Sequence, residues 1–123
     1  TLDAALYEAS YYGSLDVIKC LIENGADVHS NDDFALKSAS INNRLETVEY
    51  LIKKEGNIHA DGNYALRYAS SNGWLEIVKL LVEHGADIHT DNDSALRRAI
   101  EYKQKEVADY LISQGANYLI LID

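Results

Sequence analysis

The chain repeats itself every 30 residues, and this period constrains the fold more than any other feature of the sequence. Four copies align without a gap, and four positions are identical in every copy. They are Ala5, Ala35, Ala65 and Ala95; Leu6, Leu36, Leu66 and Leu96; Ala9, Ala39, Ala69 and Ala99; and Leu21, Leu51, Leu81 and Leu111. A fixed period of this length indicates a stack in which each copy packs against its neighbours. We therefore interpret residues 1–123 as one domain of four repeats, 3–32, 33–62, 63–92 and 93–122.

Each repeat predicts two short amphipathic helices joined by a turn, so the expected fold class is all-α. In the second repeat, Ala35, Leu36 and Ala39 place an apolar stripe on the first helix, and the apolar positions of 45–52 do the same for the second. Helices of about ten residues are marginal alone, because nucleation costs more than so few hydrogen bonds return. Stacking of the repeats must therefore stabilise them.

Polar residues and glycines mark the helix ends at the same period. One column stands where the first helix needs a side-chain acceptor, and we predict N-caps there: Asp3, Asp33, Asn63 and Asp93. Another column ends the first helix with residues that tolerate left-handed geometry: Gly13, Asn43 and Gly73.

Residues 72–88 read Asn-Gly-Trp-Leu-Glu-Ile-Val-Lys-Leu-Leu-Val-Glu-His-Gly-Ala-Asp-Ile, and 15–27 carry the same signature. This resembles the second helix and following turn of an ankyrin repeat, and the resemblance covers essentially the whole chain. It implies an ankyrin-repeat solenoid of helix-turn-helix units. The period is 30 where about 33 is usual, and the missing residues fall in the turn. We expect shortened turns in place of long β-hairpin fingers.

The start of the first helix also departs from the family. The usual Thr-Pro-Leu-His is replaced by sequences such as Tyr64-Ala65-Leu66-Arg67, and the chain has no proline. This variant of the repeat is similar to the ankyrin sets of giant DNA viruses.

The resemblance implies protein recognition through a concave face built from the turns and the exposed side of the first helices. The variable positions of the family, with the aromatic residues beside them, give these candidates: Tyr11, Tyr12, Ile41, Asn42, Tyr64, Tyr68, Ser71, Asn72, Trp74, Glu101 and Tyr102. Tyrosine suits a binding face because it offers apolar area and a hydroxyl at low entropic cost. For Phe34 and Tyr64, packing between repeats is as good an interpretation as a place on the binding face. Tyr12 and Tyr102 are expected to be exposed. Alanine at Tyr68 and Trp74 is expected to abolish binding with little change in melting temperature.

A basic column, Lys37, Arg67 and Arg97, follows the invariant leucine, with Arg98 beside it. One interpretation is a ladder of ion pairs between repeats, with the turn residues Asp32, Asp61 and Asp91 as partners. The other is that Arg67, Arg97 and Arg98 bind an acidic partner.

Nothing in the sequence indicates a metal, a cofactor or an enzyme. His29, His59 and His89 share a column, but stacked helices lie about 8–10 Å apart, too far for successive rings to share one zinc ion. We expect these histidines to hydrogen-bond the neighbouring turn and to give stability a mild pH dependence. No phosphate-binding loop, nucleophile motif or calcium loop is present. We expect no catalysis and no small-molecule substrate.

The net charge of −9 disfavours nucleic acid and anionic membranes as partners. The single cysteine, and the lack of a long apolar run or a signal peptide, favour an intracellular protein of the cytoplasm or nucleus, in the host cell if it is viral. The fourth repeat carries polar residues where the earlier repeats have apolar ones, so we expect it to cap the C-terminal end of the stack. Self-association through the repeat 1 end or the apolar tail 118–122 is a further interpretation.

The leading interpretation of function is a protein-binding module or adaptor. Two alternatives stay open at this point. The chain could be an architectural segment of a longer solenoid, or a regulatory ankyrin domain of a larger enzyme.

Overall fold

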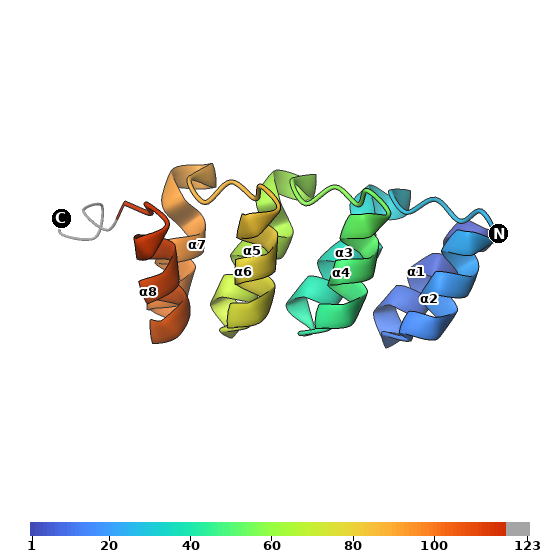
Figure 1. Cartoon of the computed structure of the whole chain (residues 1–123), viewed down its shortest axis with the longest axis horizontal. Coiled ribbons are helices and arrows are strands. Elements are labelled where there is room, and N and C mark those ends of the chain that lie inside the picture. Colours follow the sequence, from blue (N-terminus) through green and yellow to red (C-terminus); the bar gives the residue numbers. More distant parts are fainter. Residues whose placement is uncertain (118–123) are drawn as a thin grey trace.

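A computed structural model of the chain describes residues 1–117, and over these residues it is a stack of eight helices in two rows. The first helices of the four repeats are α1 (Leu2–Tyr12), α3 (Ser30–Ile41), α5 (Ala60–Asn72) and α7 (Thr90–Glu101). The second helices are α2 (Leu15–Glu23), α4 (Leu45–Lys53), α6 (Leu75–Glu83) and α8 (Lys105–Ser113). The two rows lie one in front of the other, and the turns that join successive repeats run along one edge (Figure 1). The predicted all-α fold of helix-turn-helix repeats is confirmed.

The core lies between the two rows, and the invariant columns fill most of it. Leu36, Leu66 and Leu96 are buried, as are the alanines at the same columns of the inner repeats. The alanines and buried serines let successive first helices approach more closely than successive second helices do. For example, the Ser38 hydroxyl of α3 donates to the Ser10 carbonyl of α1 at 2.9 Å. The stack is therefore tighter on its first-helix side.

The turn between repeats is short, as the period predicts, and its backbone is left-handed. Before α3 continues as a right-handed helix, Asn31, Asp32 and Asp33 take φ of 54°, 55° and 57°. The same geometry recurs at 61–63 and 91–93. Every residue at these positions is Asn, Asp or Gly, the types that best tolerate left-handed backbone. No strand occurs in residues 1–117, so no β-hairpin finger is present there.

The predicted N-caps are wrong, and the difference explains how each repeat closes. The cap of α1 is Thr1, whose hydroxyl accepts from the Ala4 N–H at 3.0 Å. The column of Asp33 instead accepts from the backbone N–H that lies 24 residues later, after the second helix of the same repeat. These four bonds join Asp3 to Asp27, Asp33 to Asn57, Asn63 to Asp87 and Asp93 to Asn117. Asp33, Asn63 and Asp93 end the left-handed turn, and their side chains bond across the repeat and not to the N–H groups of their own helix.

The left-handed ends of the first helices are confirmed. Gly13, Asn43 and Gly73 have φ of 79°, 58° and 77°, and Lys103 adopts the same geometry at 61°. Glycine also leaves room for a neighbour, because a Cβ at Gly13 would come within 2.3 Å of Arg44 of the next repeat.

Both end faces of the stack carry uncovered apolar side chains. Val17 is 47% exposed, although its equivalents in the other three repeats are buried. Ile100 is 41% exposed, although the serines at its column are buried. The fourth repeat is therefore not a wholly polar cap. The apolar tail 118–122 lies outside the described residues. None of the described helices is long and apolar enough to cross a membrane.

Candidate functional site

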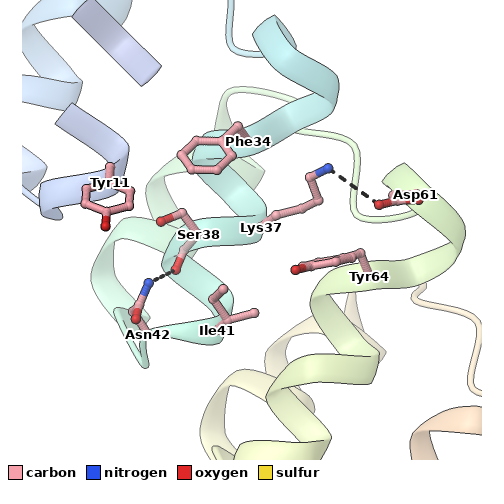
Figure 2. A pocket seen from close by; sticks show the side chains of 8 residues that line it. All are labelled: Tyr11, Phe34, Lys37, Ser38, Ile41, Asn42, Asp61 and Tyr64. Atoms are coloured by element: carbon pink, nitrogen blue, oxygen red, sulfur yellow. Dashed lines mark hydrogen bonds and ion pairs between the residues drawn. The ribbon is translucent and has the colours of Figure 1, made fainter. Parts of the chain in front are cut away.

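The exposed sides of α1, α3, α5 and α7 form one continuous surface, which we call the first-helix face. A groove of about 650 Å³ crosses it between α1, α3 and α5. Figure 2 shows the side chains that line this groove: Tyr11, Phe34, Lys37, Ser38, Ile41, Asn42, Asp61 and Tyr64.

The structure brings four of the predicted residues together in the groove, namely Tyr11, Ile41, Asn42 and Tyr64. The sequence did not select Ser38 or Asp61 as site residues, and it assigned Lys37 only to the basic column. A signal was available, because Lys37 and Ser38 share columns with the candidates Arg67 and Tyr68. One turn of helix separates these columns from the selected ones, so they lie on the same face.

At the α1 and α3 end of this face, aromatic rings are open to solvent. The rings of Tyr7 and Phe34 stack across the two helices, with centroids 4.3 Å apart. Tyr11 and Tyr12 meet edge to face at 5.3 Å and are 67% and 77% exposed. Phe34 therefore packs between repeats and also borders the groove.

At the α5 and α7 end, the aromatic rings are covered by cations of the chain itself. Tyr64 and Tyr68 stack on α5 with centroids 4.3 Å apart. The Lys37 ammonium lies 5.2 Å from the Tyr64 centroid, and the Arg98 guanidinium lies 4.3 Å from that of Tyr68. Arg67 lies within 6 Å of both rings. This stack is thus sandwiched between Lys37 and Arg98.

The basic column is only partly the predicted ion-pair ladder. Lys37 of α3 does bridge the acids of two successive turns, at 3.6 Å from Asp32 and 3.8 Å from Asp61. Figure 2 shows the contact with Asp61. Arg67, however, donates to the carbonyls of Asp61 and Gly62 in the turn of its own helix.

Arg97 repeats this arrangement with the carbonyls of Asp91 and Asn92. The left-handed turn leaves its carbonyls without helical donors, and the fork of an arginine satisfies two of them. Much of the hydrogen-bonding capacity of Arg67 and Arg97 is therefore used inside the chain.

Three predicted residues, Ile41, Asn72 and Trp74, form the contact between the second and third repeats. The Trp74 indole N–H and the Asn72 side-chain amide both donate to the Ile41 carbonyl, at 2.9 and 3.1 Å. Ser71 is buried, and its hydroxyl donates to the Arg67 carbonyl at 3.2 Å. Ser71 therefore offers no side chain to an exposed face. Trp74 is half-buried, so its truncation would lower the melting temperature, contrary to expectation.

The remaining candidates, Glu101 and Tyr102, lie at the end of α7 away from the groove. Both are exposed, and Tyr102 reaches 54%. Exposure of Tyr12 and Tyr102 agrees with expectation.

The histidines hydrogen-bond the turn residue four positions later, as expected. His29 Nδ1 lies 2.7 Å from an Asp33 carboxylate oxygen, and His59 and His89 make the same contact with Asn63 and Asp93. The hydrogen bond to Asp33 is the main cause that raises the pKa of His29 above 6.5, and partial burial opposes it. His29 is therefore linked to the Asp33 side chain that closes the second repeat.

The described residues contain no group of three or more His, Cys, Asp or Glu placed to hold a metal ion. The chemistry that this face offers is that of recognition, with stacked rings, an apolar groove and hydrogen-bonding groups at its rim.

The sequence model of the family described as ankyrin repeats (3 copies) matches residues 2–61 and 36–121. No curated protein sequence matches the chain significantly.

Proposed function

Because the chain belongs to the ankyrin repeat family, whose repeats generally mediate protein–protein interaction, we propose that it is an adaptor whose protein partner docks on the first-helix face. The observation that carries this proposal is the groove between α1, α3 and α5, bordered by rings that the fold leaves exposed. Exposed tyrosines are costly to leave in water and are enriched at the centre of protein interfaces.

The shape of the stack supports the same face. Successive first helices pack more closely than successive second helices do, and this asymmetry favours curvature toward the first-helix face. A concave surface can surround a partner side chain or segment and remove more of its area from water than a flat surface can.

The second-helix side offers less for recognition. The first-turn acids of its four helices are all exposed: Asp16, Glu46, Glu76 and Glu106. Such a charged surface is well solvated, and dispersed charges contribute little to specific affinity.

Proteins of this family are typically binding modules without catalytic activity, and we propose no reaction for this one. We place the protein inside a cell, in the cytoplasm or nucleus. We propose that its partner is neither nucleic acid nor an anionic membrane, because both would be repelled by a net charge of −9.

Affinity capture from cell lysate with matched variants tests the docking face. The variant Tyr11→Ala/Tyr12→Ala/Tyr102→Ala removes exposed rings from the first-helix face. The control Cys20→Ala/Glu49→Ala/Ile112→Ala changes three exposed residues of second helices. We expect the control to retain a specifically captured protein and the tyrosine variant to lose it, with both melting temperatures within a few degrees of the parent. Equal capture by both variants would contradict the proposal.

A second candidate is an architectural segment of a longer solenoid, favoured by the uncovered Val17 and Ile100. A further repeat packed on either end would bury these side chains as it buries their equivalents. This role predicts that neither triple variant changes any specific capture, whereas Val17→Asp and Ile100→Asp disrupt the assembly.

A further inference from the structure

We propose that the groove between α1, α3 and α5 binds a lysine or arginine side chain from a basic segment of the protein partner. This inference rests on the proposed function and names the chemistry of the partner at one place on the first-helix face.

The first step is that the chain places its own cations beside one of its aromatic stacks. The Tyr64–Tyr68 stack has a cation on each side, with Lys37 near Tyr64 and Arg98 over Tyr68. The face of an aromatic ring is electronegative, so a cation placed over it is attracted, more strongly when both groups are partly removed from water. The fold therefore completes this stack with positive charge.

The second step is that the other aromatic stack of this face, which joins two helices instead of lying along one, has no cation from the described part of the chain over its rings. Tyr7 and Phe34 stack at the same centroid distance of 4.3 Å. Within residues 1–117, the cation contacts fall on Tyr50, Tyr64, Tyr68 and Tyr110, and none falls on Tyr7 or Phe34. Phe34 borders the groove and Tyr7 is 43% exposed. Tyr7 stands over Phe34 where Lys37, at the same column of the next repeat, stands near Tyr64. A cation from outside the chain would therefore contact the part of these rings that borders the groove.

The third step concerns Lys37, which lines the groove and would repel a second cation. Its ammonium lies within 4 Å of two carboxylates, those of Asp32 and Asp61. Arg67 donates to the Asp61 carbonyl and lies 5.8 Å from the Tyr64 ring centroid, so two cations and two carboxylates balance here and Lys37 adds no net repulsion. The net charge of −9 adds a long-range attraction for a basic segment.

The fourth step is that the groove suits the whole side chain, including its apolar stem. Lysine and arginine bury their methylene groups on apolar surface while the charged end keeps polar contacts. Ile41 and Tyr11 supply apolar wall, Phe34 supplies the ring, and Asp61 supplies a carboxylate at the rim (Figure 2). The volume of about 650 Å³ exceeds the space that one such side chain needs, so flanking residues of the segment also fit.

The test is fluorescence anisotropy with three labelled peptides, Gly-Ser-Xaa-Gly-Xaa-Ser-Gly, in which Xaa is arginine, citrulline or glutamate. Citrulline keeps the shape and hydrogen bonding of arginine and removes the charge. We expect saturable binding of the arginine peptide at physiological salt, at least roughly 10-fold weaker binding of the citrulline peptide, and none of the glutamate peptide.

Variants locate the binding. Phe34→Leu keeps apolar volume and removes the ring, and should weaken the arginine peptide roughly 3–30-fold. Tyr11→Leu, at an exposed position where unfolding is not expected, should weaken it roughly 2–5-fold. The control Ile112→Ala removes exposed apolar area from the second helix α8, outside the groove, and should leave the affinity unchanged.

Failure of the inference is distinguishable from failure of the proposed function. Binding of the citrulline or glutamate peptide as tight as that of the arginine peptide would overturn the cationic specificity, as would the absence of saturable binding. If neither Phe34→Leu nor Tyr11→Leu changes the affinity for the arginine peptide, the groove is not its binding site. In each of these cases, loss of a captured protein in the tyrosine triple variant would still support the first-helix face as the docking surface.

Discussion

The two aromatic stacks of the first-helix face have the same ring spacing and opposite surroundings. Tyr7–Phe34 joins α1 to α3 and is open, whereas Tyr64–Tyr68 lies on α5 and is closed by Lys37 and Arg98. The difference arises at two columns: Lys37 stands where Tyr7 stands one repeat earlier, and Arg98 stands where the earlier repeats have Glu8, Ser38 and Tyr68. Repeats that share one backbone thus differ in whether their aromatic rings are covered or exposed, and single side-chain differences decide which.

The largest expected effect is on the free energy of unfolding, and it tests whether one cooperative core supports both the open and the closed stack. Leu66 is buried on α5, where repeats on both sides pack against it. Leu66→Ala should lower the free energy of unfolding by about 2–5 kcal/mol, because a cavity is left in a tightly packed layer. Urea denaturation followed by circular dichroism measures this.

Leu6→Ala, at the same column but with a neighbouring repeat on one side only, is the matched comparison and should cost less. A larger loss at Leu6 than at Leu66 would contradict a stack stabilised by its neighbours.

The next effect concerns Trp74, which ties the closed part of the face to the open part through the Ile41 carbonyl. Trp74→Phe should lower the free energy of unfolding by about 1 kcal/mol, because the indole hydrogen bond is lost while Asn72 still serves that carbonyl. Trp74→Ala should cost about 3 kcal/mol through lost packing. Thermal denaturation of both variants measures the difference. If neither variant changes stability and both lose a captured partner, Trp74 belongs to the binding surface instead.

A smaller effect converts the closed stack into an open one. Arg98→Leu removes the cation over Tyr68 and should lower the free energy of unfolding by about 0.5–1 kcal/mol. The exposed Tyr68 face should then add a second, weaker site for the arginine peptide, visible as a biphasic anisotropy titration. Arg97→Leu, whose guanidinium holds turn carbonyls, is the control and should add no such site. A single unchanged phase in Arg98→Leu would mean that cation coverage does not separate the two stacks.

The smallest expected effect is a pH dependence of stability that arises at the turn at the start of α3. The Asp33 carboxylate raises the pKa of His29, so the folded state holds its proton more tightly than the unfolded state does. This stabilisation is fully present below pH 6.5 and is lost as the pH rises through the raised pKa. The effect should be small because the His29 side chain is 52% exposed.

The variant Asp33→Asn copies the natural His59–Asn63 turn, in which an amide still accepts the backbone N–H. Melting temperatures between pH 5.5 and 8 should fall with pH more steeply in the parent chain than in this variant. Identical slopes would show that the ion pair contributes nothing.

The sequence predicted what depends on the backbone repeat. Identical alanines and leucines 30 residues apart require equivalent environments, and the structure provides them. The short turn followed from the period, and the left-handed end at Gly13 followed from residue type. These features depend on one repeat or on its nearest copy.

The sequence predicted less about the side chains that differ between repeats. Asp33 was assigned as an N-cap because capping is a local rule, but the left-handed turn directs its carboxylate to the backbone N–H of Asn57. The contact of Arg98 with Tyr68 joins successive copies of one column whose residue type changes in every repeat, so no repeated pattern signals it. The groove itself depends on which rings are left uncovered, and this is decided only when neighbouring repeats are in place.

The most direct measurement is an amide NMR titration of the ¹⁵N-labelled chain with the arginine peptide. The account predicts that the largest shifts fall on α1 and α3, near Tyr7, Tyr11 and Phe34, that smaller shifts reach Tyr64 at the far wall of the groove, and that Tyr68 and the outer surfaces of α6 and α8 are spared. Shifts centred on the second helices, or equal shifts at both stacks, would contradict it.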